Sequence, residues 1–279
     1  MAEHSTADAG RLHVVLVQAA SSLDPSANAA ALRDLVDRAA AEARERNPLV
    51  GEVLVVLPEV FQRDFGKPDT DLAAFAEPLD GEFVGALTAA AVEHGVSVVA
   101  GMFRAVEGGR PLNTLVLRRP DGTGVEYDKI HLYDSFGYKE SDRLAAGEWK
   151  PVTVTVGGLR LGLMTCYDLR FPELARALVD DGADAIIVPA AWVAGDRKVD
   201  HWRTLTKARA IENTAYVVAV GQPAQRYSGH SLVVSPLGDV LVEADAGKAE
   251  EPTLLHAVLQ TTDVTSARSV NPSLANRRR

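Results

Sequence analysis

Cysteine is almost missing from this chain of 279 residues, which contains a single one, Cys166. One cysteine excludes a disulfide within the chain, and it argues against a structural zinc site, which usually uses several thiolates. Such a composition fits a reducing compartment, so we expect a cytoplasmic protein. A lone cysteine is commonly a small buried hydrophobe, and its position in the chain must therefore decide whether it is reactive.

Long apolar stretches and positive charge are scarce as well. No run reaches the roughly 20 apolar residues of a membrane-spanning helix, and the nearest, 185–194, contains Pro189. Residues 1–10 are polar and acidic, without the apolar core of a secretory signal. Lys and Arg number 29 against 38 Asp and Glu, a net charge of -9, whereas nucleic-acid surfaces are usually basic. We therefore expect neither a membrane nor a nucleic acid as partner.

The apolar pattern predicts an α/β protein in which strands outnumber helices. Helices recur between the strands, which suits two sheets sandwiched between helical layers better than one doubly wound sheet. We expect one domain over 1–279, with a core at about 11–263, a flexible N-terminus at 1–10 and a C-terminal tail at 264–279. Strands are expected at 11–19, 51–57, 96–103, 111–119, 125–129, 151–156, 159–165, 185–188, 215–220, 230–235, 239–244 and 254–259, and helices at 25–46, 81–94, 173–181 and 199–214.

Three of the predicted strands end abruptly in a polar residue. The strand at 51–57 runs into Glu59, a second ends in Lys129, and the strand at 159–165 runs into Cys166 just before a helix. Open α/β sheets place their ligands at the carboxyl ends of strands. Taken singly, the glutamate suits a solvated loop charge, and the lysine suits a side chain that extends along the surface. If the three ends share one rim, a carboxylate, an ammonium and a thiol meet there.

This set of groups suffices for the hydrolysis of an amide. Cys166 would attack the carbonyl carbon as a thiolate, and Glu59 would take the thiol proton and return it to the leaving amine. Charged Lys129 would stabilise the oxyanion, with the backbone N–H of Tyr167 as a second donor because it follows the nucleophile at a turn. No segment has the pattern of a nucleotide-binding loop or a metal site, so no cofactor is implied.

The segments around these residues resemble the three signature segments of the carbon–nitrogen hydrolase (nitrilase) superfamily. They are 58–59 (Pro-Glu), 127–132 (Tyr-Asp-Lys-Ile-His-Leu) and 166–173 (Cys-Tyr-Asp-Leu-Arg-Phe-Pro-Glu). The resemblance implies a four-layer α-β-β-α sandwich, a homodimer or larger homo-oligomer, and a triad of Glu59, Lys129 and Cys166. It also implies a second glutamate that orients the substrate, and Glu140 matches it. Taken alone, Glu140 suits a solvated loop charge.

The residues that follow Cys166 narrow the resemblance to one branch, which includes ω-amidase and deaminated glutathione amidase. This likeness implies a cysteine amidohydrolase that cleaves a non-peptide amide of a small carboxylate-bearing substrate through a thioester, releasing ammonia. In that branch the arginine of the motif, here Arg170, binds a substrate carboxylate. The alternative is a structural ion pair with Glu173 or Asp168. The chain departs from the branch at 195–200, a segment that we expect to border the pocket.

Other functions are compatible with the same residues. A nitrile or N-carbamoyl hydrolase of this superfamily would use the same triad, and a non-catalytic protein would bind a metabolite or act through its dimer surface. A redox sensor ranks last among the alternatives, because an activated thiol oxidises readily but the chain has no second cysteine to resolve the sulfenate. His131 could act as a papain-like base, but with Glu59 in that role we favour a hydrogen-bonded scaffold histidine. For the tail we expect contact with a partner subunit, with disorder as the alternative.

Overall fold

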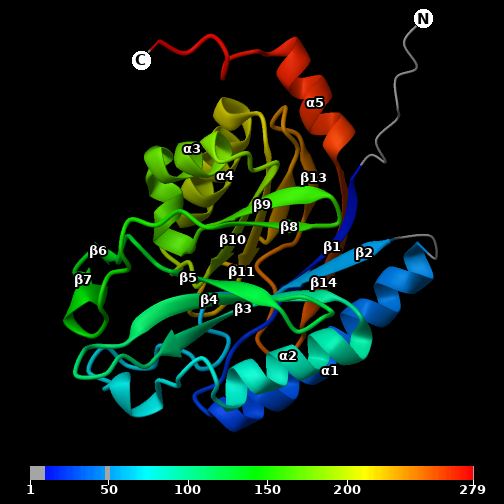
Figure 1. Ribbon diagram of the computed structural model, residues 1–279. Coiled ribbons are helices and arrows are strands. Elements are labelled where there is room, and N and C mark those ends of the chain that lie inside the picture. The colour runs from blue at the N-terminus through cyan, green and yellow to red at the C-terminus, as the bar shows by residue number, and fades with distance from the viewer. Residues whose placement is uncertain (1–9, 48–50, 279) are drawn as a thin grey trace, which may run out of the picture.

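Two six-stranded sheets lie face to face between outer layers of helices (Figure 1). A computed structural model describes residues 10–47 and 51–278 of the chain. Helices α1 (Pro25–Arg46) and α2 (Glu82–His94) cover one outer face, and α3 (Pro172–Asp180) and α4 (Lys198–Asn213) cover the other. The predicted α-β-β-α sandwich is therefore confirmed, and the bounds predicted for the helix at 25–46 agree with those of α1.

The first sheet combines three parallel strands with a hairpin and an antiparallel edge. Its order is β14-β1-β2-β3-β4-β5, with β1, β2 and β3 parallel to one another. Strands β4 and β5 each run antiparallel to the strand before them, so β5 points the same way as β2. The bounds are β1 (Arg11–Gln18), β2 (Glu52–Val56), β3 (Ser97–Arg104), β4 (Leu112–Arg118), β5 (Gly124–Asp128) and β14 (Thr253–Gln260).

The second sheet has the order β13-β12-β11-β10-β9-β8, and its central strands β9, β10 and β11 are parallel. Its edge strands pair antiparallel with their neighbours. The bounds are β8 (Thr153–Val156), β9 (Leu159–Leu163), β10 (Ala185–Ala190), β11 (Tyr216–Gly221), β12 (Leu232–Val234) and β13 (Val240–Glu243). A small hairpin of β6 (Asp134–Ser135) and β7 (Tyr138–Lys139) projects from one side of the sandwich.

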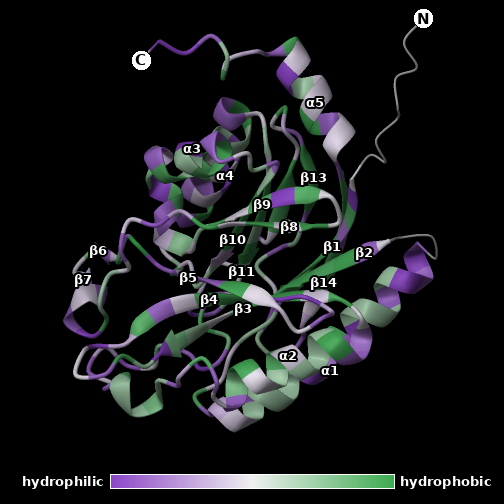
Figure 2. Ribbon diagram, in the orientation of Figure 1, coloured by the Kyte–Doolittle hydropathy of each residue, from purple (hydrophilic) through white to green (hydrophobic). Residues whose placement is uncertain are grey.

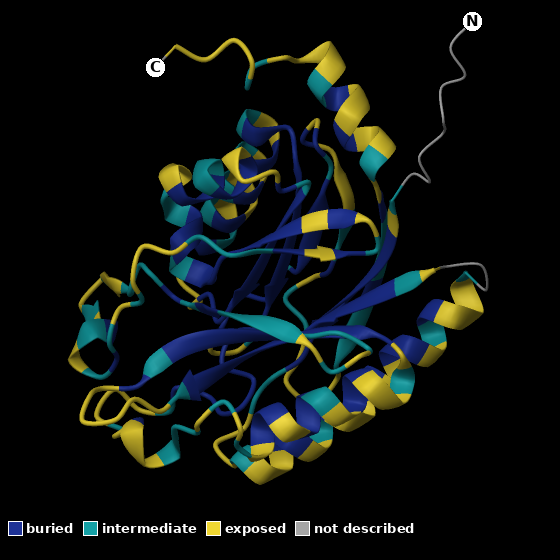
Figure 3. Cartoon of the chain, viewed as in Figure 1, coloured by how far each residue is buried: buried dark blue, intermediate teal, exposed yellow. Residues whose placement is uncertain are grey.

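The strands are apolar on both faces because each sheet is covered on both sides. In β1, Val14 and Leu16 pack between the two sheets, whereas Val15 and Val17 pack against α1 and α2. This assignment follows from the alternation of side chains along a strand. The central strands are buried (Figure 3) and green in the hydropathy colouring (Figure 2), while polar residues gather on the outer faces of the helices. Parallel strands buried on both faces characteristically have such continuous apolar runs.

The C-terminal region differs from the prediction of a tail beginning at residue 264. Helix α5 (Thr261–Val270) follows β14 directly, with Val264 and Ala267 buried. The Tyr216 hydroxyl donates to Asp263, and Arg277 donates to Asp180 at 3.0 Å, so this segment packs on its own chain. Two buried positions in ten leave too little periodicity to predict a helix. The predicted contact with a partner subunit stays a prediction, and residues 1–9 of the predicted flexible N-terminus lie outside the described residues.

Across residues 10–47 and 51–278, no helix combines the length and apolarity required to cross a bilayer.

Buried His13 on β1, paired with half-buried His256 on β14, predicts a loss of stability in acid. His13 Nε2 lies 3.1 Å from His256 Nδ1, and burial, followed by the charge of His256, lowers the pKa of His13 to about 4. Unfolding returns the pKa to about 6.5, so the unfolded chain binds the proton first. The contribution is therefore complete above pH 6.5 and is lost as the pH falls toward 4. In urea unfolding, we expect wild-type protein to lose about 2–3 kcal/mol more than His13→Gln between pH 7.5 and 4.5. Equal losses would contradict this assignment.

Candidate active site

The three predicted strand ends meet at one rim of the sandwich. Glu59 follows β2, Lys129 follows β5 directly, and Cys166 begins the short 3-10 helix η3 (Cys166–Arg170) after β9. Glu140 joins them as the first residue of a second 3-10 helix, η2 (Glu140–Asp142). All four line one cavity of about 610 Å³. Because β2, β5 and β9 contribute their carboxyl ends, residues far apart in the sequence reach a single pocket.

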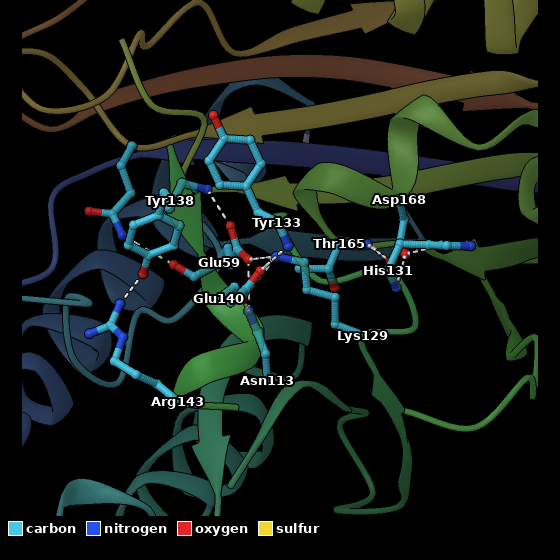
Figure 4. A network of polar contacts seen from close by, with 12 residues as sticks. Glu59, Asn113, Lys129, His131, Tyr133, Tyr138, Glu140, Arg143, Thr165 and Asp168 are labelled. Carbon is cyan, nitrogen blue, oxygen red and sulfur yellow. Dashed lines mark hydrogen bonds and ion pairs between the residues drawn. The ribbon is translucent and has the colours of Figure 1, made fainter. Parts of the chain in front are cut away.

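The Lys129 ammonium lies between two carboxylates (Figure 4). Its Nζ is 2.9 Å from Glu59 Oε1 and 2.8 Å from Glu140 Oε2. Asn113 on β4 donates to both carboxylates, at 2.7 Å to Glu59 and 3.2 Å to Glu140. Each carboxylate also accepts a backbone N–H group, with Ala191 N 2.6 Å from Glu59 Oε2 and Tyr133 N 2.7 Å from Glu140 Oε2. Such complete hydrogen bonding is what makes a buried group of charges tolerable.

The two carboxylates beside Lys129 keep its ammonium protonated. Burial acts to lower the pKa of Lys129, but the carboxylates of Glu140 and Glu59 outweigh it and raise the pKa well above its ordinary value. The pKa of Glu140 is raised, first by burial and then by the charge of Glu59, although Lys129 opposes the shift. A permanently charged ammonium beside the thiol is suited to hold a developing oxyanion.

The thiol of Cys166 is protonated at rest and held in a strained turn. Burial raises its pKa well above the ordinary value, and the charge of Glu59 raises it further, against the opposing effect of Lys129. The thiolate therefore has to be formed by proton transfer during the reaction, and the interacting Glu59 carboxylate is the base within reach. Cys166 has a φ of 46°, a left-handed conformation that non-glycine residues adopt at a cost of about 1–3 kcal/mol and that occurs often at active sites.

Asp168 holds the turn that presents the thiol. Its buried carboxylate accepts the Tyr127 hydroxyl at 2.7 Å and the backbone N–H of Thr165 at 2.9 Å. It also lies 2.7 Å from His131 Nδ1, and the His131 ring stacks on Phe171 with 3.7 Å between centroids. The structure thus supports the scaffold interpretation of His131 over the papain-like one. Tyr167 lies in the first turn of η3, where backbone N–H groups have no acceptor within the helix.

Arg170 faces the cavity and is not part of an ion pair among the described residues. Its guanidinium carbon lies 4.9 Å from the centre of a Trp192 ring, and Nη2 is 3.5 Å from His201 Nδ1. Neither Glu173 nor Asp168 lies within ion-pair distance of it in that part of the chain. The alternative of a structural ion pair is therefore not observed, and the guanidinium stays available to a ligand.

Sequence reasoning missed several groups that shape this site. Asn113 and the Ala191 N–H orient the Glu59 carboxylate, yet neither an asparagine within a strand nor a backbone amide has a distinctive pattern. The aromatic residues Tyr133, Phe136 and Tyr138, which line the cavity, were not predicted to do so. Three aromatic residues within six positions of a polar loop would have indicated a binding surface.

Gly101 on β3 supports the turn that contains Glu59, and we predict that it tolerates no side chain. A Cβ at this position would lie 2.3 Å from Val60 N, so Gly101→Ala must displace the Glu59 turn. We expect this variant to lose about 1–3 kcal/mol of stability by overpacking and to lose activity as well. Gly85→Ala on α2 is the matched control, because a Cβ there meets nothing within 4 Å. Chemical denaturation and turnover measurements that show no difference between the two variants would contradict the prediction.

Comparison with known proteins identifies the class to which this site belongs. The sequence profile of the carbon-nitrogen hydrolase family matches residues 13–269. The chain belongs to this family and is a hydrolase of carbon–nitrogen bonds other than peptide bonds. The predicted superfamily is therefore confirmed.

Individual relatives are similar to this chain over most of its length. Hydrolase Rv0480c of Mycobacterium tuberculosis is 39% identical over 274 residues, which cover 92% of each chain. A deaminated glutathione amidase of Escherichia coli O157:H7 is 38% identical over 226 residues, or 81% of this chain and 84% of the relative. The crystal structure of XC1258 from Xanthomonas campestris, a CN-hydrolase superfamily protein with an arsenic adduct in its active site, has a TM-score of 0.81 at 29% identity and covers 96% of this chain and 98% of that one.

Proposed function

We propose that this protein is a cysteine amidohydrolase that cleaves the amide of a small carboxylate-bearing substrate through a thioester on Cys166. The observation that carries the proposal is the buried cluster of Lys129 between Glu59 and Glu140, which lines one cavity with the thiol. A carboxylate base, a fixed cation and a protonated thiol are the groups that amide hydrolysis by a cysteine requires. The similarity to a deaminated glutathione amidase supports an amide as substrate.

Acylation follows from the positions of these groups. Glu59 takes the proton of the Cys166 thiol while the sulfur attacks the carbonyl carbon, forming a tetrahedral oxyanion. The Lys129 ammonium and the backbone N–H of Tyr167 stabilise the negative oxygen. When the carbon–nitrogen bond breaks, Glu59 gives its proton to the leaving nitrogen, and ammonia or an amine departs.

Deacylation reverses these roles. Glu59 takes a proton from water, the hydroxide attacks the thioester carbon, and collapse releases the acid while the sulfur recovers its proton from Glu59. Glu140 keeps Lys129 in position through its two contacts at 2.8 and 3.1 Å, and it borders the cavity in which the substrate is oriented.

The proposed function is tested by incubating the protein with α-ketoglutaramate, deaminated glutathione and simple nitriles. We expect 2-oxoglutarate from the two amides, with ammonia from the first of them, and no acid from the nitriles. Faster hydrolysis of nitriles or of N-carbamoyl compounds would instead favour those activities of the superfamily. Tight binding of an amide without any product would favour the non-catalytic alternative.

Arg170 is proposed to hold the substrate carboxylate, because a guanidinium presents a planar fork of donors to it. Arg170→Gln should raise KM for α-ketoglutaramate about 10- to 100-fold, with a smaller effect on kcat, since a hydrogen bond to a charged group contributes about 1.5–3 kcal/mol. Arg197→Gln is the control, because the Arg197 side chain lies on the cavity rim and is 70% exposed. Equal KM changes in the two variants would show that Arg170 does not bind the carboxylate.

We further propose that the protein works in the cytoplasm as a homodimer or a larger homo-oligomer. The single cysteine supports a reducing compartment. The similarity to the superfamily supports self-association, as do the exposed apolar side chains of Ile211, Leu237 and Leu241 near α4 and β13. Light scattering after size-exclusion chromatography tests the assembly, and a monomer at micromolar concentration would overturn that part of the proposal.

A further inference from the structure

The Lys129 ammonium has as many carboxylate contacts as it has hydrogens. An ammonium carries three N–H donors, and Lys129 Nζ lies 2.9 Å from Glu59 Oε1 and 3.1 and 2.8 Å from Glu140 Oε1 and Oε2. In the resting site each donor therefore already has an acceptor. To donate to the oxyanion of a bound amide, Lys129 has to release one of these contacts. The contact with Glu140 Oε1 is the longest, so its release costs least.

Asn113 donates to the same two carboxylate oxygens as Lys129 (Figure 4). Its Nδ2 lies 2.7 Å from Glu59 Oε1 and 3.2 Å from Glu140 Oε1. A primary amide has two N–H donors, one for each of these contacts. When Lys129 gives up its contact with Glu140 Oε1, this oxygen keeps the amide N–H. A buried carboxylate oxygen left without any donor would be costly, and Asn113 removes that cost.

The oxygen of the Asn113 amide shows that the N–H donors determine how this side chain lies. Asn113 is fully buried, and its Oδ1 has no hydrogen-bond donor in the part of the chain that the structure describes. Turning the amide over would bring this oxygen against two carboxylate oxygens, so the carboxylates fix its orientation. An unpaired acceptor in the interior is unfavourable and rare in folded proteins. An apolar residue of the same size would avoid this loss, which favours a role for the two N–H groups.

The backbone keeps Asn113 in a fixed position beside Lys129. Asn113 pairs with Phe103 on β3, and the backbone N–H of Lys129 donates to Asn113 O at 2.8 Å. The amide therefore stays in place while the ammonium rotates about its last bond. Asn113 is not among the described residues that line the cavity, so it acts on the substrate only through its neighbours.

We propose that Asn113 is a positioning residue, which holds the carboxylates of Glu59 and Glu140 in place while Lys129 turns one N–H from Glu140 to the oxyanion. This inference rests on the proposed function and adds to it a residue that does not touch the substrate. The exchange of donors takes place only when the oxyanion forms. Asn113 should therefore affect the rate of the chemical steps and leave the binding of the planar amide unchanged.

Asn113→Leu tests the inference, because leucine has a similar volume and neither N–H donor. With α-ketoglutaramate we expect kcat to fall about 10- to 100-fold, while KM stays near the wild-type value. Asn113→Ala removes the donors without placing an apolar group against the carboxylates, and it should show the same pattern. Thr114→Val is the matched control, because Thr114 is equally buried on β4 and its hydroxyl donates to Asp128 at 2.6 Å. Both of its kinetic constants should stay close to those of the wild type.

An aldehyde analogue provides a readout that does not depend on turnover. The S–H bond of Cys166 adds across the C=O bond of α-ketoglutarate semialdehyde, with the sulfur on the carbon and the proton on the oxygen. The tetrahedral adduct resembles the reaction intermediate, and such analogues report transition-state stabilisation. We expect Asn113→Leu to weaken inhibition by the semialdehyde by about the factor by which it lowers kcat. Calorimetric binding of α-ketoglutaramate to Cys166→Ala should be the same with and without Asn113→Leu.

Each other outcome overturns the inference. An unchanged kcat would show that Lys129 reaches the oxyanion without help from Asn113. A weaker binding of the amide, or a rise in KM that matches the fall in kcat, would assign Asn113 to the shape of the resting site. Unchanged inhibition by the semialdehyde would exclude an effect on the tetrahedral oxygen. All of these results leave the proposed function intact, whereas a wild-type protein that hydrolyses no amide overturns both.

Discussion

Replacing Cys166 with alanine should lower kcat on the order of a million-fold, the size of effect seen when a catalytic nucleophile is removed. The reason is that the remaining groups of the site, Glu59 and Lys129, can polarise the amide but cannot form a covalent intermediate. Turnover of α-ketoglutaramate, followed by release of 2-oxoglutarate, measures this loss. Residual activity of a few per cent would mean that another group attacks the carbonyl.

The same variant should stay folded, which separates a chemical loss from a structural one. The side chain of Cys166 is small, and Asp168 holds its turn through the Tyr127 hydroxyl and the backbone N–H of Thr165. We therefore expect a change in unfolding free energy of no more than about 1 kcal/mol. Circular dichroism and urea unfolding provide this control.

Replacing Lys129 with methionine should damage both activity and stability. Loss of an oxyanion donor reduces kcat about 10²- to 10³-fold. Loss of the ammonium also leaves two buried carboxylates facing each other, and breaking a buried charge cluster in this way costs about 3–5 kcal/mol. The cost should be smaller at pH 5 than at pH 8, because burial and the charge of Glu59 already raise the pKa of Glu140 and protonation relieves the repulsion.

Lys139→Met is the matched control for Lys129→Met, since Lys139 lies on β7 in the same region and is exposed. Its effect on the free energy of unfolding should stay within about 0.5 kcal/mol. Urea unfolding of both variants at the two pH values makes the comparison. Similar stabilities for the two variants would show that the Lys129 cluster contributes no net stabilisation.

The sequence predicts most of the fold because apolar residues recur with a clear spacing in each element, and this spacing differs between helices and strands. Strands buried on both faces, such as β1 and β10, appear as continuous apolar runs, and α1 has a regular apolar face between a capping Asp24 and Asn47. Helix α5 is not predicted from the sequence, because its position depends on contacts such as that of Asp263 with Tyr216, which no local pattern encodes.

The candidate site was predicted only in part, for a related reason. Glu59, Lys129 and Cys166 were recognisable because each follows a predicted strand, and the fold brings those strand ends together. Asn113 was not recognisable, because its position depends on strand pairing. Lys129 N donates to Asn113 O at 2.8 Å, and this pairing places the side-chain amide of Asn113 beside both carboxylates.

The central claim is that Cys166 becomes acylated with Glu59 as its base, and trapping the intermediate tests it most directly. Wild-type protein mixed with substrate and quenched in acid within milliseconds should gain the mass of the acyl group, and peptide mapping should place that mass on Cys166. In Glu59→Gln, this acyl adduct should not accumulate within the same time. An actively turning over enzyme without an adduct, or with the adduct on another residue, would contradict the account.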